Sequence, residues 1–210
     1  MISEALFEGF ILSIGLIIAI GSQNIFVLKQ GLLGRYTFTI ALTCTICDFL
    51  LICLGSLGLG PIIAKIIWLR QIAIWGGASF LIYFGVSSWI GIFKGNLISN
   101  TLKEESENST TFKSVILASL GFSLLNPHAF LDTVVLIGGI ASRFDDLHAR
   151  LLFTLGAGIA SALWFFSLSY GARLLRPFFQ KETTAVTFEF LSGSTMFWIA
   201  WGLIQPELML

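Results

Sequence analysis

Six apolar segments follow one another along the chain, separated by short polar or charged links. A helix needs roughly 20 apolar residues to cross a lipid bilayer, and each segment approaches or exceeds that length. The segments cover residues 6–28, 38–59, 71–93, 115–142, 151–175 and 186–204. The pattern predicts an all-α integral membrane protein in which residues 1–210 form a single transmembrane domain.

Polar residues interrupt two of these segments. The first contains Gly21-Ser22-Gln23-Asn24, where glycine allows a helix to unwind. The fourth contains Asn126-Pro127-His128, and proline breaks or kinks a helix just before itself because it lacks an N–H. Freed carbonyl groups near Ser123 and the start of the resuming helix then become available to a ligand. A proline kink whose polar groups are satisfied by a neighbouring helix is the alternative reading.

A hydrophilic stretch at residues 94–113 divides the six segments into three and three. We expect it to be a mobile loop joining two repeats, at about residues 1–93 and 114–206. Three crossings per repeat make the second repeat run inverted relative to the first. Both repeats open with an interrupted helix, and this arrangement marks the binding site in many secondary transporters. We therefore expect the two interruptions to face each other.

Acidic residues within apolar segments are the candidates for substrate binding. Asp132 lies one helical turn after His128, so that both share one face, and Asp48 lies in the second segment. A charge at such a depth costs roughly 2.5–3.5 kcal/mol and therefore requires a partner, a cavity or a ligand. These groups could bind a cation or carry a proton. Structural alternatives are a His–Asp pair and a protonated helix–helix hydrogen bond.

The remaining candidates are polar or aromatic side chains near the interruptions. Gln23 and Asn24 could bind the amino and carboxylate groups of an amino acid. Trp164 lies in the middle of the fifth segment, where it could line a cavity or simply pack. Lys29 is expected to anchor the first segment at the membrane interface.

Three cysteines lie in the second segment, and Cys44 and Cys47 form a Cys-x-x-Cys pair. We interpret them as small packing residues. A thiol–disulfide carrier with inverted halves is the alternative, but it would need a cysteine in the second half, and none follows Cys53.

Composition supports a membrane protein and limits the kinds of partner that we expect. Hydrophobic residues make up 56% and charged residues 11% of the chain, against about 25% charged in soluble domains. The net charge of zero gives no reason to expect a nucleic-acid partner, and membrane lipid is the expected surrounding. The start has no basic region typical of a cleavable signal peptide. The links between segments 1–2, 3–4 and 5–6 carry eight lysines and arginines against four on the other side, which favours both termini outside the cytoplasm.

The same residues resemble the LysE-type amino-acid exporters, and most closely the branch that exports basic amino acids. The similarity covers nearly the whole chain and is most specific in the fourth segment. The residues that carry it are Gly21-Ser22-Gln23-Asn24-Ile25-Phe26-Val27 with Gln30-Gly31, Asp48 with Leu51-Ile52 and Gly55, Leu125-Asn126-Pro127-His128 with Leu131-Asp132-Thr133, and Leu163-Trp164-Phe165-Phe166. Ser22 departs from the family, which usually has proline there, so the first break would depend on Gly21 alone.

The resemblance implies a bacterial inner-membrane exporter of L-arginine, L-lysine or their analogues, driven by antiport of protons or by the membrane potential. It implies a transporter rather than an enzyme, with no ATP, prosthetic group or metal. Export of neutral amino acids and a passive pore remain alternatives, and glycine-rich helix faces allow a homodimer. The expected substrate-binding residues are Gln23, Asn24, Asp48, Asn126, Pro127, His128, Asp132 and Trp164. The expected proton-coupling residues are His128, Asp132 and Asp48.

Overall fold

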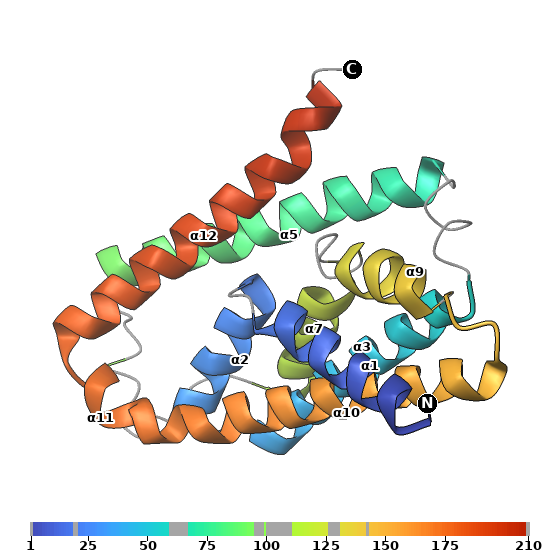
Figure 1. Ribbon diagram of the computed structural model, residues 1–210. Helices are drawn as coiled ribbons and strands as arrows, with labels where there is room; N and C mark the ends of the chain where they lie inside the picture. Colours follow the sequence, from blue (N-terminus) through green and yellow to red (C-terminus); the bar gives the residue numbers. More distant parts are fainter. Residues whose placement is uncertain are drawn as a thin grey trace.

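The computed structural model describes residues 2–18, 21–58, 67–94, 99, 111–125, 131–141 and 143–208, and these residues are helical wherever they are regular (Figure 1). The helices, in chain order, are α1 (Ile2–Ile17), α2 (Ser22–Leu33), α3 (Thr37–Ser56), α5 (Ile67–Phe93), α7 (Phe112–Leu124), the π-helix η1 (Leu131–Ile137), α9 (Gly138–Ala141), α10 (Leu147–Gly171), the 3-10 helix η2 (Ala172–Leu175), α11 (Arg176–Phe179) and α12 (Glu182–Leu208). The predicted all-α class is therefore confirmed.

Within the described part of the chain, three helical stretches are long and apolar enough to cross a bilayer: Thr37–Ser56, Ile74–Phe93 and Leu147–Phe179. The bent pair Glu4–Ile17 and Ser22–Leu33 makes a fourth if it counts as one span. Large apolar side chains such as Phe93, Leu174 and Trp198 are exposed on the outer surface, where lipid would surround them. These features define a multi-pass helical membrane protein.

The first segment is broken where the sequence predicts an interruption. α1 ends at Ile17, and α2 begins at Ser22 after Gly21, whose backbone is extended. The axes of the two arms meet at 81°. Ser22 is the first residue of α2, a position that favours proline without requiring it. The missing family proline is therefore compatible with a sharp break, which places Gln23 and Asn24 in the first turn of α2.

The fourth segment is also divided. α7 ends at Leu124, three residues before Pro127, and the next helix that the structure describes is the π-helix η1, which begins at Leu131. π-helical turns are rare and frequently occur at functional sites. Most of the predicted loop at 94–113 lies outside the described residues, as do Asn126, Pro127 and His128.

The sequence suggests that the fifth segment ends at Arg176-Pro177, but the helical stretch continues past these residues. The chain continues through η2 and α11, so that residues Leu147–Phe179 form one apolar stretch. Pro177 occupies the first turn of α11, where the missing N–H has no intrahelical acceptor to lose. Proline here starts a new helix in place of terminating the old one.

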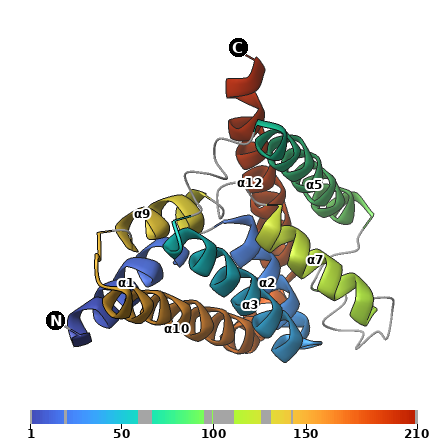
Figure 2. The same cartoon turned by 90° about the vertical axis from the view of Figure 1, so that its right-hand side faces the viewer.

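Two groups of helices make up the molecule (Figures 1 and 2). In the larger group, α10 lies against α1, α2 and α3, and α3 also packs on α7, η1 and α9. The second group is the pair α5 and α12, which pack along each other beside the first group. We call these the main bundle and the α5–α12 pair.

Glycines allow the closest helix contacts in the main bundle. A Cβ atom at Gly156 of α10 would collide with the backbone carbonyl of Leu6 in α1, and one at Gly9 would collide with that of Phe153. Helices in membranes associate through such small residues because lipid supplies no hydrophobic driving force between them.

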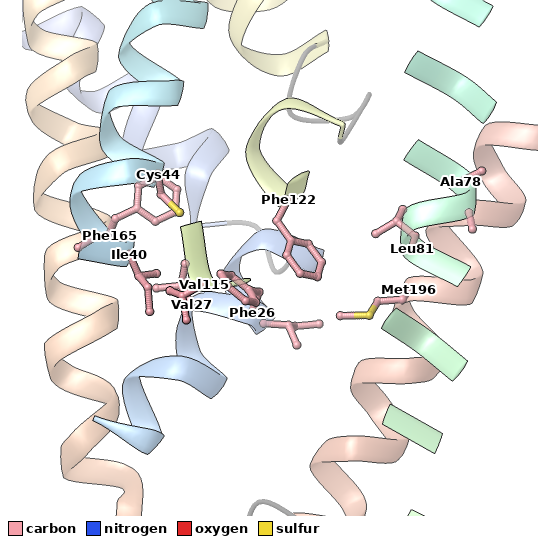
Figure 3. Packing of buried hydrophobic residues seen from close by; sticks show 13 residues of the cluster. Phe26, Val27, Ile40, Cys44, Ala78, Leu81, Val115, Phe122, Phe165 and Met196 are labelled. Carbon is pink, nitrogen blue, oxygen red and sulfur yellow. The ribbon is translucent and has the colours of Figure 1, made fainter. Parts of the chain in front are cut away.

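A buried apolar cluster joins the two groups of helices. Phe26 of α2 and Phe122 of α7 stack with ring centroids 4.7 Å apart. From the α5–α12 pair, Leu81 and Met196 point toward these rings (Figure 3). The α5–α12 pair therefore covers the side of the main bundle on which the two helix breaks meet.

Candidate functional site

The two helix breaks lie side by side. Gln23, in the first turn of α2, is buried, and its Nε2 donates a hydrogen bond to Oγ of Ser123 at 3.0 Å. Ser123 is in the last turn of α7, immediately before the second break. Because 100 residues separate these partners, the contact joins the first and second halves of the chain.

Asp48 lies next to this junction and is the buried acid of α3. Only 3% of the residue is exposed, and Oγ of Ser161 in α10 donates a hydrogen bond to its Oδ2 at 3.2 Å. The side chain of Gln23 is another polar neighbour of this carboxyl group. Oδ1 has no hydrogen-bond partner among the described residues. A buried carboxylate oxygen without a partner is costly, which makes this atom a candidate ligand for a cation or a proton.

Asn24 links the same region to α1 and α10. Its Nδ2 donates to the carbonyl oxygen of Ile17 at 2.7 Å, which ties the start of α2 to the end of α1. Its Oδ1 accepts a hydrogen bond from Nε1 of Trp164 at 3.1 Å. Trp164 lies one turn after Ser161, so α10 presents both donors on one face. The Trp164 indole is thus positioned by polar contact as well as by packing.

The structure brings four of the predicted site residues together around the start of α2: Gln23 is a polar neighbour of Asp48, and the next residue, Asn24, accepts a hydrogen bond from Trp164. Asn126, Pro127, His128 and the side chain of Asp132 lie outside the described residues. The backbone of Asp132 belongs to η1, which packs on α3. Two serines that the sequence analysis did not select, Ser123 and Ser161, complete the network. Their small hydroxyl groups gave no signal that separates them from other serines in apolar helices.

A charged pair was also missed. Nζ of Lys29 lies 2.6 Å and 2.8 Å from the two carboxylate oxygens of Glu189 in α12. Lys29, which we expected to be an interfacial anchor, lies within α2, and its ammonium group meets an acid that is 2% exposed. Glu189 is an acid inside the sixth apolar segment, and that alone marks it as a candidate functional residue.

The cysteines are free thiols in α3. Cys44 is completely buried in the cluster that also contains Phe26 and Phe122, and Gln23 and Ser123 are among its polar neighbours. Its position agrees with a packing role beside the site.

The fold and the buried polar site together indicate the class of membrane protein. A helical membrane protein whose interrupted helices meet at buried polar groups has the architecture of a secondary transporter. The family profile described as LysE type translocator matches residues 14–206, and the chain belongs to this family. The predicted family resemblance is thereby confirmed.

Relatives of the chain are similar over almost their full length. The arginine exporter protein ArgO of Escherichia coli K12 is 34% identical over 195 residues, which cover 92% of this chain and 90% of the relative. A protein of Aeromonas salmonicida, provisionally named amino-acid transporter YggA, is 34% identical over 202 residues, or 96% of each chain. The ArgO protein of Klebsiella pneumoniae is 34% identical over 199 residues, covering 95% and 92%. No solved structure gives a significant match.

Proposed function

We propose that this protein exports L-arginine, and related basic amino acids such as L-lysine, from the cytoplasm across the bacterial inner membrane. Export is driven by proton antiport or by the membrane potential. Family membership and the relatives named as arginine exporters support this proposal. The observation that carries it is the buried carboxyl group of Asp48 beside the junction of the two helix breaks, whose Oδ1 has no hydrogen-bond partner in the part of the chain that the structure describes.

Asp48 suits a cationic side chain for an electrostatic reason. The acid is buried, so a guanidinium or ammonium group there interacts in a medium of lower dielectric constant than water. A guanidinium group also presents several N–H donors in a plane, which matches a carboxylate. A neutral side chain would leave the carboxylate unpaired and would therefore bind less well.

The remaining predicted residues would bind the common part of the substrate or transfer protons. Gln23 and Asn24 offer amide groups in the first turn of α2, whose N-terminal N–H groups favour a carboxylate. Asn126, Pro127 and His128 would form the opposite wall, and Trp164 would close it. Protons would be exchanged by His128, Asp132 or Asp48.

We further propose that the six predicted segments form two inverted three-helix repeats. The packing supports this topology. α10, the second span of the later repeat, lies on the broken helix α1–α2 of the earlier one, and α3 lies on the broken stretch from α7 to α9. The third spans, α5 and α12, lie on each other, and Gly85 faces Gly193 at their crossing. When the second span of each repeat packs on the broken helix of the other repeat, both breaks lie at the centre of the molecule.

Export from substrate-loaded cells tests the proposed substrate class. Cells that lack other basic-amino-acid exporters and produce this protein would be fed dipeptides containing arginine, lysine, ornithine, threonine or leucine. We expect rapid release of arginine and, less strongly, of lysine and ornithine, with release of threonine and leucine equal to that from cells without the protein. A profile restricted to neutral amino acids would overturn the proposal in favour of a neutral exporter.

A further inference from the structure

The ion pair between Lys29 and the buried Glu189 lies outside the residues proposed to bind substrate. It joins α2 of the main bundle to α12 of the α5–α12 pair. Lys29 is six residues after Gln23 in the same short helix, so a contact that fixes Lys29 also fixes α2, whose first turn enters the site.

α2 makes a series of contacts along its successive turns. Gln23 donates to Ser123 of α7, Phe26 stacks on Phe122 of α7, and Lys29 pairs with Glu189 of α12. One turn further, Leu32 packs in a small buried cluster that includes Ala185 of α12. The arm is therefore held against α7 at its beginning and against α12 at its end.

The α5–α12 pair covers the site through aromatic rings. Phe80 and Phe84 of α5 contact Phe122 with ring centroids 4.8 Å and 4.7 Å away. Phe122 is adjacent to Ser123, the acceptor for Gln23. To this aromatic packing the ion pair adds a charged contact between α2 and α12, with N–O distances of 2.6 Å and 2.8 Å.

We infer that the Lys29–Glu189 ion pair is a positioning element. It fastens the α5–α12 pair to α2, the helix whose first turn enters the site, and so holds Phe80 and Phe84 of α5 in place over the site. This inference rests on the proposed function. It assigns neither residue a direct contact with substrate. It explains why the chain maintains a charged pair at a place where two apolar side chains would fill the space at lower desolvation cost.

The two partners differ in exposure, so the inference predicts different effects for replacing each of them. Glu189 is 2% exposed, while the Lys29 side chain is 31% exposed. Lys29→Gln strands a buried carboxylate, which is strongly unfavourable. Glu189→Gln leaves a long flexible ammonium that can reach toward water. The double variant Lys29→Gln/Glu189→Gln removes both charges and retains hydrogen-bonding amides.

Native Cys44 provides a readout that does not depend on transport, because it is buried beside Gln23 and Ser123. In a Cys47→Ala/Cys53→Ala background, its rate of modification by N-ethylmaleimide would be measured in membranes. In parallel, the KM for arginine would be measured in proteoliposomes at equal amounts of transporter. Lys181→Gln and Glu182→Gln, at exposed positions near the start of α12, are the matched controls.

We expect Lys29→Gln to raise both the Cys44 modification rate and the KM about tenfold, Glu189→Gln to raise them less, and the double variant to return both toward wild type. The controls should behave as wild type. A Lys29→Gln protein that is less abundant, yet has wild-type Cys44 modification and KM, would overturn the inference. If the wild-type protein carries no arginine, the proposed function fails, while the Cys44 rates still test the positioning role.

Discussion

Asp48→Asn is expected to reduce arginine export about a hundredfold, which corresponds to about 2.7 kcal/mol of lost interaction with the substrate cation. Asparagine has nearly the same shape and keeps an acceptor for the Ser161 hydroxyl, so the change removes the charge and little else. The amount of protein in the membrane should not fall, because the variant no longer buries a charge. The measurement is the initial rate of arginine release from dipeptide-loaded cells, divided by the amount of transporter.

Asp145→Asn is the matched control for this prediction. Asp145 is exposed in the link before α10, so the same chemical change should leave export at the wild-type rate. Asp48→Glu keeps the charge but moves it by about one methylene and should retain part of the activity. Export by Asp48→Asn at the wild-type rate would remove Asp48 from the substrate site.

The largest effect on folding is expected for Gly156→Val. The backbones of α1 and α10 approach so closely that even a Cβ at this position would meet the carbonyl of Leu6. A valine must push α1 away, and overpacking a tight contact of this kind costs about 3 kcal/mol. Because α1 carries the first break, its displacement would also move Gln23 and Asn24. Membrane abundance and the thermal unfolding temperature of the detergent-solubilised protein should both fall.

Gly202→Val provides the comparison. Gly202 is in α12, where nothing lies within 4 Å of an added Cβ, and the residue is exposed. The same substitution there should leave abundance and unfolding temperature close to wild type. Equal behaviour of the two variants would contradict the glycine contact between α1 and α10.

Sequence periodicity could predict the helical class and the two interruptions because both follow from local chemistry. Gly21 marks a place where a helix can unwind and Pro127 one where a helix breaks or kinks, and α1 and α7 end shortly before them. The end of the fifth segment was misjudged because Pro177 is compatible with the first turn of a helix as well as with a stop. Only the surrounding backbone decides between the two.

The polar network was harder to predict because its partners are distant in sequence. Asp48 and Gln23 stood out as expensive residues in an apolar segment, but nothing local identified Ser123 and Ser161 as their neighbours. Lys29 was judged by its closeness to a polar link, whereas its partner Glu189 is 160 residues away. A residue that pairs across the molecule has no signature in its own segment beyond being charged where charge is costly.

The central claim is that Asp48 selects for a positive charge on the substrate. Citrulline has nearly the shape of arginine, but a neutral ureido group replaces the guanidinium group. Competing uptake of the two amino acids by proteoliposomes containing the wild-type or Asp48→Asn protein would therefore isolate the charge. We predict that the wild-type protein strongly prefers arginine and that this preference falls to about parity in Asp48→Asn, in keeping with the loss of one buried charge pair. An arginine preference that is the same in both proteins would contradict the claim.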